Sequence, residues 1–332
     1  MTRTSRSLAL AAVLLAAAAW PGRAAERIVL MVGGVEKIIY LPVKLAQQLG
    51  YFQQEGLDVD VRSEWAGVRG VDMLLVGGAQ GVVGFYDHTV YMQTQGKAVV
   101  CVVQFAQAPG EVELVSSRLP KVRSMADLAG QTLGVTGLGS STQFLSRYLA
   151  LSAGLRLNQV AFKPVGTGNA FIEAMANGTI GAGMTTEPTA SRLLATGKAR
   201  VLVDLRTPED TARALGGPYP ASCLYMQTAW VNRHKPEVQK LVNALVKALR
   251  YIQTHTASEI AAHVPAEYYG DDKAIYIRAL ARSKPIFIPD GRMPANGPAN
   301  VLRVLTHTER SLQGRAVDLA STYTLEFVNA VK

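Results

Sequence analysis

The stretch Pro42-Val-Lys-Leu-Ala-Gln-Gln-Leu-Gly-Tyr-Phe-Gln-Gln-Glu-Gly-Leu-Asp-Val59 indicates a helix, a turn and a strand in direct succession. Apolar side chains predict a helix over residues 39–48, with Pro42 tolerated in its first turn and Gly50 closing it. Residues 57–61 read as a strand, and an apolar strand at residues 27–31 precedes the helix. The chain therefore opens with a β/α alternation.

The alternation continues beyond this stretch. We predict a helix over residues 68–76, a short buried strand at 81–85, a helix over 87–95 and a strand at 98–105. This order implies a largely parallel sheet that is covered by helices.

After residues 106–111 the same layout begins again, with strands at 112–116 and 132–135. In both halves a helix-ending glycine leads through a short apolar strand to an acidic residue at the next helix start: Gly78-x-x-Gly81-x5-Asp87 and Gly178-x-x-Gly181-x5-Glu187. We therefore predict an α/β protein of two similar lobes, each a mostly parallel sheet with helices on both faces.

From residue 236 onward the pattern becomes helical. We expect a strand at residues 223–231 to return the chain to the first lobe, so that the last helices complete it. The predicted lobes are residues 25–107 with 224–332, and residues 108–223. Crossings near residues 106–111 and 218–223 would form a two-segment hinge.

Residues 1–24 have the features of a secretory signal peptide. Arg3 and Arg6 precede an apolar stretch at residues 8–19, and a small-x-small triplet follows at 22–24. Twelve residues rise only about 18 Å, too little for a membrane span of about 30 Å. We expect export to the periplasm without a lipid anchor, because no cysteine follows the apolar run.

Composition excludes several classes of protein. The chain has 48% hydrophobic and 18% charged residues, which is typical of globular domains. Cleavage after Ala24 would remove three arginines and lower the formal charge from +9 to +6, with no basic run that would suit nucleic acid. Cys101 and Cys223 lack metal-binding spacing, and whether they form a disulfide stays open.

Ligands of open α/β sheets bind at the carboxyl ends of the strands. Four loops should meet there: residues 33–40, 84–88, 136–142 and 185–188. In the third, Gly137-Leu-Gly-Ser-Ser-Thr142 begins a helix whose free N–H groups and dipole suit an anion. The alternative is ordinary capping of that helix by Ser140 or Ser141.

Acidic and aromatic residues supplement these loops. Glu36, Asp87 and Glu187 could accept hydrogen bonds from a ligand, or only stabilise helix N-termini. Aromatic rings could hold the ligand, or pack in the core. The predicted ligand-binding residues are Glu36, Lys37, Tyr40, Trp65, Tyr86, Asp87, Gly137, Ser140, Ser141, Thr142, Thr185 and Glu187.

The motifs of an enzyme are missing from the sequence. Of the five histidines only His88 falls in a cleft loop, and no H-E-x-x-H, G-x-S-x-G, S-x-x-K or phosphate-binding Gly-Lys-Ser/Thr motif occurs. We therefore expect no catalytic residue, no metal and no cofactor. Binding without chemistry fits the sequence better than catalysis does.

The opening stretch resembles the P-x3-A-x3-GYF-x2-EGL-x-V signature of the periplasmic solute-binding proteins related to the thiamine-precursor, taurine, alkanesulfonate and nitrate receptors of ABC importers. Ser124-x-x-Asp-Leu-Ala-Gly resembles the family's entry to the second lobe, and Asn177-Gly178 with Glu187-Pro188 resembles a later segment. The resemblance spans the mature chain and implies the type II periplasmic-binding fold. Gly181 replaces the family's acidic residue, which weakens any transfer of ligand identity.

The resemblance implies a receptor that captures a small organic molecule between the lobes and delivers it to an ABC permease in the inner membrane. Glu36 and Glu187 would favour a nitrogen heterocycle, whereas Lys37 and the helix start at residues 140–142 would favour an aromatic or sulfonated acid. We expect a monomer. Two alternatives are an enzyme on the same fold, similar to a thiamine-pyrimidine synthase, and a receptor for another transporter or a sensor.

Overall fold

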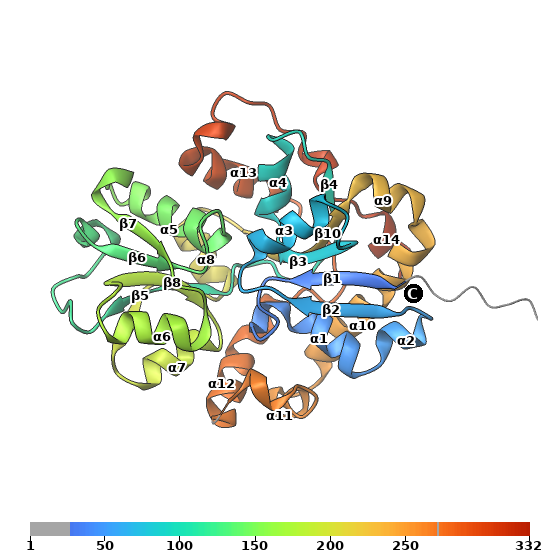
Figure 1. The fold of residues 1–332 in the computed structure, drawn as a ribbon, viewed down its shortest axis with the longest axis horizontal. Coiled ribbons are helices and arrows are strands. Elements are labelled where there is room, and N and C mark those ends of the chain that lie inside the picture. The colour runs from blue at the N-terminus through green and yellow to red at the C-terminus, as the bar shows by residue number, and fades with distance from the viewer. Residues whose placement is uncertain (1–26, 271) are drawn as a thin grey trace, which may run out of the picture.

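The structure, a computed structural model, describes residues 27–270 and 272–332. The predicted signal peptide lies outside the described residues. Figure 1 shows two α/β lobes beside each other, one built around blue and cyan strands and the other around green strands. The predicted fold class is confirmed by two separate five-stranded sheets.

The first sheet has the order β2-β1-β3-β10-β4. Its strands are β1 (Ile28–Val32), β2 (Val59–Ser63), β3 (Gly81–Phe85), β4 (Val99–Gln104) and β10 (Ser222–Gln227). β1 runs parallel to β2 and β3, whereas β10 is antiparallel to both β3 and β4. β3 and β4 are buried along their whole length, as their unbroken apolar runs predict.

The second sheet repeats this arrangement with the order β7-β6-β8-β5-β9. Its strands are β5 (Glu111–Ser116), β6 (Thr132–Val135), β7 (Ala161–Pro164), β8 (Ala182–Thr186) and β9 (Ala199–Leu205). β5 is the antiparallel strand in fourth place, as β10 is in the first sheet. β3 and β8, the strands of the two glycine motifs, are both third in their sheets, so the predicted internal repeat is present.

Two neighbouring segments connect the lobes. Residues 105–110 lead from β4 to β5, and residues 216–221 lead from α8 (Pro208–Leu215) to β10. They are bonded to each other, because the Ala221 N–H donates to the Ala106 carbonyl at 3.0 Å. Each crossing thus supplies the antiparallel strand of the sheet that it enters. The predicted boundary after residue 223 falls inside β10, and we propose that the chain rejoins the first lobe at Ser222.

Two local predictions need correction. The predicted helix at residues 39–48 is a 3-10 turn, Ile38–Tyr40, followed by α1 (Leu41–Gln48). The predicted strand at 223–231 ends at Gln227, and α9 (Thr228–Arg233) follows it. The physical reason is the sheet edge: Gln227 pairs with Val99, where β4 begins, so β10 has no partner on that side beyond this point.

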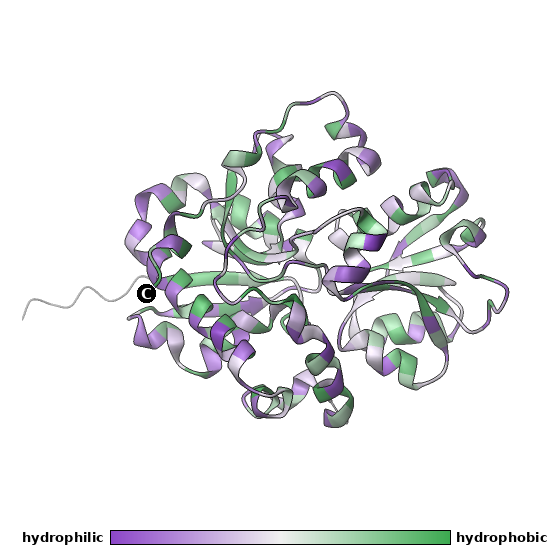
Figure 2. Cartoon of the chain, turned by 180° about the vertical axis from the view of Figure 1, so that it is seen from behind, coloured by the Kyte–Doolittle hydropathy of each residue, from purple (hydrophilic) through white to green (hydrophobic). Residues whose placement is uncertain are grey.

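Helices cover both sheets, as predicted. Besides α1, α8 and α9, those before residue 200 are α2 (Tyr51–Gln54), α3 (Gly67–Leu75), α4 (Asp87–Gln93), α5 (Ser141–Ser152), α6 (Gly168–Ala176) and α7 (Thr189–Ala195). The C-terminal ones are α10 (Lys235–Thr254), α11 (Ala257–Ala261), α12 (Lys273–Ser283), α13 (Gly297–Thr308) and α14 (Glu326–Asn329). Figure 2 shows hydrophobic strands inside the lobes and hydrophilic stretches on the outer helices. The buried apolar residues form one large cluster that spans both lobes and a smaller cluster within the second lobe.

The C-terminal helices also touch the second lobe. α13 packs against α4 and α5, and Arg147 on α5 forms a 2.6 Å ion pair with Glu309 just beyond α13. α12 packs against α7. The second lobe is therefore in contact with two helices from the C-terminal part of the chain, α12 and α13.

Both cysteines are free and buried. Cys223 stands opposite Gln104 in the sheet, and Cys101 stands opposite Tyr225, so the two cysteines are not paired with each other in the strand register. Within residues 27–270 and 272–332, no helix combines the length and the apolar character that a membrane span needs.

Candidate functional site

A small cavity lies where the two lobes meet, at the carboxyl ends of the parallel strands. Its volume is about 10 Å³, about what a single water molecule needs. The first lobe contributes Lys37, Ile39, Tyr40, Gly67, Phe85 and His88, and the second contributes Glu111, Thr136, Ser140, Ser141, Thr142 and Thr186. A cavity of this size admits no organic molecule, so side chains on its wall or the lobes themselves would have to move to make room for one.

Five predicted residues line this cavity: Lys37, Tyr40, Ser140, Ser141 and Thr142. The rule that ligands bind at carboxyl strand ends therefore predicted loops that meet at this cavity. The other predicted residues lie around the cavity and not on its wall: Glu36, Trp65, Tyr86, Asp87, Gly137, Thr185 and Glu187.

Asp87 connects three parts of the molecule. It begins α4 in the first lobe and is fully buried. Ser141, at the start of α5 in the second lobe, donates to Asp87 Oδ1 at 2.8 Å, and Tyr219, on a crossing segment, donates to Oδ2 at 2.9 Å. Burial raises the pKa of Asp87, while His88 and these two hydroxyls oppose the rise.

The hydroxyls at the start of α5 are bonded within their own loop. Ser140 donates to the Gly137 carbonyl at 2.6 Å and lies 2.7 Å from Thr142 Oγ1, which also accepts from the Thr136 N–H at 3.0 Å. The Ser140 side chain does not cap the helix. With the Ser141 hydroxyl bonded to Asp87, the three hydroxyls at residues 140–142 all have partners within the protein.

Lys37 is a buried cation on the wall of the cavity. Its ammonium donates to the Gly33 carbonyl at 2.6 Å, and it has no carboxylate within salt-bridge distance among the described residues. Burial lowers its pKa, and the nearby Glu36 and Glu111 oppose that change. Tyr40 stands beside it, with its ring edge-on to Phe85.

Glu187 is bonded to its own lobe through both carboxylate oxygens. Oε1 pairs with buried Arg206 at 2.8 Å, and Oε2 accepts from the Ser191 N–H in the first turn of α7 at 2.9 Å. Its carbonyl oxygen accepts from the Ile38 N–H of the first lobe at 3.0 Å. Asp204 holds the other side of Arg206.

The remaining predicted residues have other surroundings. Trp65 is 46% exposed, and a Cβ on Gly137 would lie 3.0 Å from its ring, so this ring covers the boundary between the lobes. Tyr86 points away from the cavity to Thr322. Glu36 is half-buried, and Thr185 is fully buried next to the wall residue Thr186.

Sequence reasoning missed Glu111. It is 2% exposed, and its Oε2 has no hydrogen-bond partner in the part of the chain that the structure describes. Burial raises the pKa of Glu111 well above its usual range; Asp87 adds to the rise and Lys37 opposes it. The available signal was the pair of carboxylates in Glu111-Val-Glu113, which alternation places on one face of an apolar strand.

His88 also has an unsatisfied atom. Its Nδ1 lies 3.2 Å from the Tyr225 hydroxyl, whereas its Nε2 has no hydrogen-bond partner among the described residues. The Thr185 and Thr186 hydroxyls are likewise buried and unpartnered in these ranges. Because buried polar atoms are nearly always bonded, these atoms on and next to one cavity wall need a partner that the described residues do not supply, such as a water molecule or a ligand.

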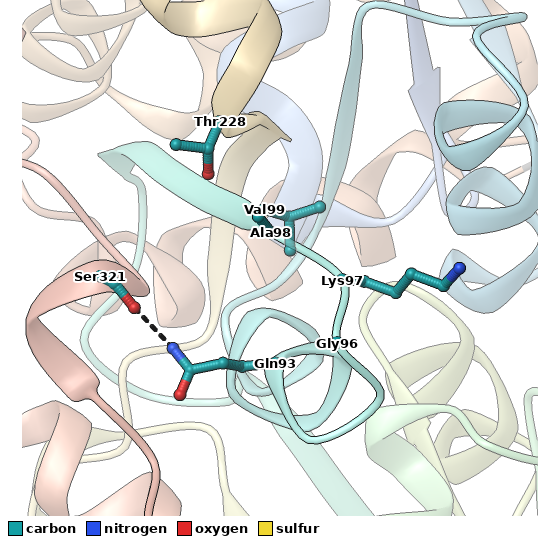
Figure 3. Close-up of a pocket in the computed structure, with 7 residues that line it drawn as sticks. All are labelled: Gln93, Gly96, Lys97, Ala98, Val99, Thr228 and Ser321. Atoms are coloured by element: carbon teal, nitrogen blue, oxygen red, sulfur yellow. Dashed lines mark hydrogen bonds between the residues drawn. The ribbon is translucent and has the colours of Figure 1, made fainter.

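A larger hollow lies elsewhere in the first lobe, at the amino end of β4. Figure 3 shows its lining residues, and Gln93 donates to Ser321 at one side. Its volume is about 310 Å³, and its wall is Gln93, Gly96, Lys97, Ala98, Val99, Thr228 and Ser321. None of these is among the buried unpartnered atoms of the described chain. We therefore take the cavity between the lobes as the candidate site.

Comparison with known proteins places this architecture in a family. The family model described as "NMT1/THI5 like" matches residues 39–258. A solved structure from Bordetella bronchiseptica RB50 has 34% sequence identity and a TM-score of 0.88, and the match covers 91% of this chain and 96% of that one.

Two further relatives are more distant. The alkanesulfonate-binding protein SsuA from Xanthomonas axonopodis pv. citri, solved bound to MOPS, has a TM-score of 0.71 at 19% identity, over 90% of this chain and 98% of that one. YtlA of Bacillus subtilis (strain 168), named as a candidate binding protein, is 23% identical over 74% of this chain and 72% of its own. These likenesses support the predicted fold, in which a ligand would lie between two lobes.

Proposed function

The chain belongs to the NMT1/THI5-like family, and on that premise we propose that it is a periplasmic solute-binding receptor. It captures a small organic molecule between its lobes and delivers it unchanged to an ABC permease in the inner membrane. The observation that carries this proposal is the cavity wall, where both lobes contribute buried polar atoms that have no partner among the described residues, His88 Nε2 and Glu111 Oε2 among them.

Binding and closure are coupled in this account. A ligand that touches both lobes can do so only when they approach, so it shifts an equilibrium between open and closed forms. Direct hydrogen bonds between the lobes include Ser141 to Asp87 and Ile38 to Glu187. The proposed contacts are Lys37, Tyr40, His88, Glu111 and Thr186, with Ser141 and Asp87 joining the lobes beside them.

The first test is to identify the ligand. Mass spectrometry of the molecules that the purified protein releases on denaturation should find one small organic compound. In a thermal-shift assay this compound should stabilise the refolded protein, by about 2.7 kcal/mol at 100 times its dissociation constant. Conversion of the compound into a product by the purified protein alone would overturn the proposal in favour of an enzyme.

We expect Ser141→Ala to weaken ligand binding about 10-fold. In the closed form this change leaves a buried carboxylate oxygen of Asp87 without its donor, whereas water can satisfy that oxygen when the lobes are apart; such a loss costs about 1–3 kcal/mol. Titration calorimetry of the variant against the wild-type protein measures the change.

Tyr219→Phe is the matched control for Ser141→Ala. It removes the other hydroxyl bonded to Asp87, and because Tyr219 lies on the crossing segment next to the first lobe, we expect it to stay near Asp87 in both forms. We expect lower stability with an affinity within about threefold of wild type. Equal losses of ligand affinity in both variants would show that the Ser141–Asp87 hydrogen bond is not specific to the closed form.

A further inference from the structure

We propose that Trp65 is the gate of the cavity between the lobes: its ring packs against Gly137 of the second lobe, closes the route between the cavity and solvent, and slows the exchange of small molecules along that route. This inference rests on the proposed function and adds to it a residue that controls access to the same site. It follows from two loops, one from each lobe, that lie between the cavity wall and the surface of the molecule.

The contact between these loops separates the cavity from solvent. In the first lobe, Gly67 lines the cavity, whereas Trp65 is 46% exposed. In the second lobe, Thr136 lines the cavity, whereas Leu138 is 53% exposed. Each loop therefore runs from the cavity wall to the surface within a few residues, and the layer in which the loops touch lies between the two.

Gly137 is the part of the second lobe that the ring contacts. A Cβ at this position would lie 3.0 Å from Cζ3 and 3.4 Å from Cη2 of Trp65, and 3.1 Å from the Cβ of Ala66. Favourable carbon–carbon contacts are about 3.5–4.0 Å long, so a side chain at position 137 would push the ring away. The lack of a side chain there lets the ring of one lobe meet the backbone of the other.

The Trp65 ring is held by its own lobe. The guanidinium carbon of Arg69 lies 5.6 Å from the ring centroid, which is within the range of a cation–π contact. The Glu64 N–H donates to the Val32 carbonyl at 2.8 Å, so the loop is bonded to the end of β1. We therefore expect the ring to move with the first lobe and to leave Gly137 when the lobes separate.

A tryptophan ring suits a gate that opens and closes. The ring carbons meet a glycine, so opening this contact breaks dispersion contacts, which are individually weak. The indole covers a large area, and only two side-chain torsion angles need to be fixed to hold it in place. Such a ring can close a passage without a strong bond that would keep it closed.

The test measures how fast a small reagent reaches the cavity, and it needs no solute. Thr186→Cys places a thiol on the cavity wall, where the threonine hydroxyl is buried and has no hydrogen-bond partner among the described residues. Methyl methanethiosulfonate converts that thiol into a methyl disulfide and releases methanesulfinate, and mass spectrometry follows the reaction. The wild-type protein is the blank, because Cys101 and Cys223 are buried.

We expect Trp65→Ala to raise the labelling rate of the Thr186→Cys protein by about 10-fold or more, because gating residues set the rates of such access. Trp65→Phe keeps a smaller ring and should raise the rate less. Trp230→Ala is the matched control, because Trp230 stacks on His234 at 4.4 Å and does not line the cavity. It should leave the labelling rate within about twofold, as substitutions away from the site usually do.

Gly137→Val tests the surface that the ring contacts. Its side chain would displace the ring, so we expect faster labelling of the Thr186→Cys protein. Added to Trp65→Ala, it should change the rate little further, because no ring is left to displace. Independent substitutions would instead multiply their effects on the rate.

Each outcome decides the inference. Faster labelling with Trp65→Ala and with Gly137→Val, but not with Trp230→Ala, supports it. A Thr186→Cys thiol that reacts equally fast with and without the Trp65 ring, or that stays unreactive in both proteins, overturns it. Circular dichroism checks that each variant is folded, and if Trp65→Ala is not, Trp65→Phe and Gly137→Val decide in its place.

The gate and the receptor function fail in different experiments. The labelling assay contains no solute, so a negative result there removes the gate and leaves the receptor function intact. Conversion of the bound compound into a product would overturn the receptor function and leave the gate in place.

Discussion

We expect replacement of Arg206 by leucine to lower the free energy of unfolding by about 3–5 kcal/mol, the usual cost of breaking a buried ion pair by removing one partner. Arg206 is 2% exposed and pairs with Glu187, which is 1% exposed, at 2.8 Å. It also bonds to Asp204 through two nitrogens at 2.8 and 2.6 Å. The variant leaves the Glu187 carboxylate buried with only the Ser191 N–H as a donor. Urea unfolding followed by circular dichroism measures the loss.

The double variant Glu187→Gln with Arg206→Leu is the control. It removes the lone buried charge, so it should be more stable than Arg206→Leu alone, and the two changes should not be additive. If Arg206→Leu lowers the free energy of unfolding by less than about 1 kcal/mol, the ion pair does not stabilise this part of the second lobe. The same conclusion follows if the effects of the two substitutions on the free energy of unfolding are additive.

The stability of the protein should fall as the pH rises from about 5 to 8, and Glu113→Gln should remove much of that fall. Burial raises the pKa of Glu113 to about 8 from an ordinary value of 4.5, while the Ser146 hydroxyl opposes the rise. The folded protein therefore keeps a proton on Glu113 over this range that the unfolded chain releases. The stability that this proton contributes is fully present below the pKa of Glu113 in the unfolded chain. It is lost as the pH rises through the pKa of Glu113 in the folded protein.

Linkage sets the size of this effect. A pKa difference of this magnitude corresponds to as much as about 5 kcal/mol above pH 8. Glutamine keeps the shape of the side chain and carries no titratable proton. The difference in the free energy of unfolding between variant and wild type therefore reports on Glu113 alone. The lowered pKa of His88 changes stability in the opposite direction, but it does so in both proteins. Denaturant unfolding at unit steps from pH 5 to 9 should give diverging curves. Parallel curves would mean that Glu113 has no raised pKa.

Much of the fold was predictable because local signals agreed with the tertiary structure. Gly78 and Gly178 precede the short apolar strands β3 and β8, which occupy the same place in their two sheets. The error at residues 228–231 has another origin. Where β10 ends depends on where its neighbour β4 begins, and a single apolar run does not contain that information.

The site was predictable in part, for a similar reason. Lys37, Tyr40 and residues 140–142 follow from the rule for carboxyl ends of parallel strands. Glu111 does not, because it begins an antiparallel strand, whose amino end reaches the same edge. The ion-pair partner of Glu187 could not be predicted either. Arg206 lies close to Glu187 only because β5 pairs with both β8 and β9.

The most direct test of the account is small-angle X-ray scattering of the purified protein, without ligand and at a saturating concentration of the compound that mass spectrometry identifies. The account predicts that the ligand lowers the radius of gyration, because the lobes close around it, and that Ser141→Ala requires more ligand for the same change. A radius of gyration that stays the same at saturation would contradict the claim that this protein captures its ligand by bringing two lobes together.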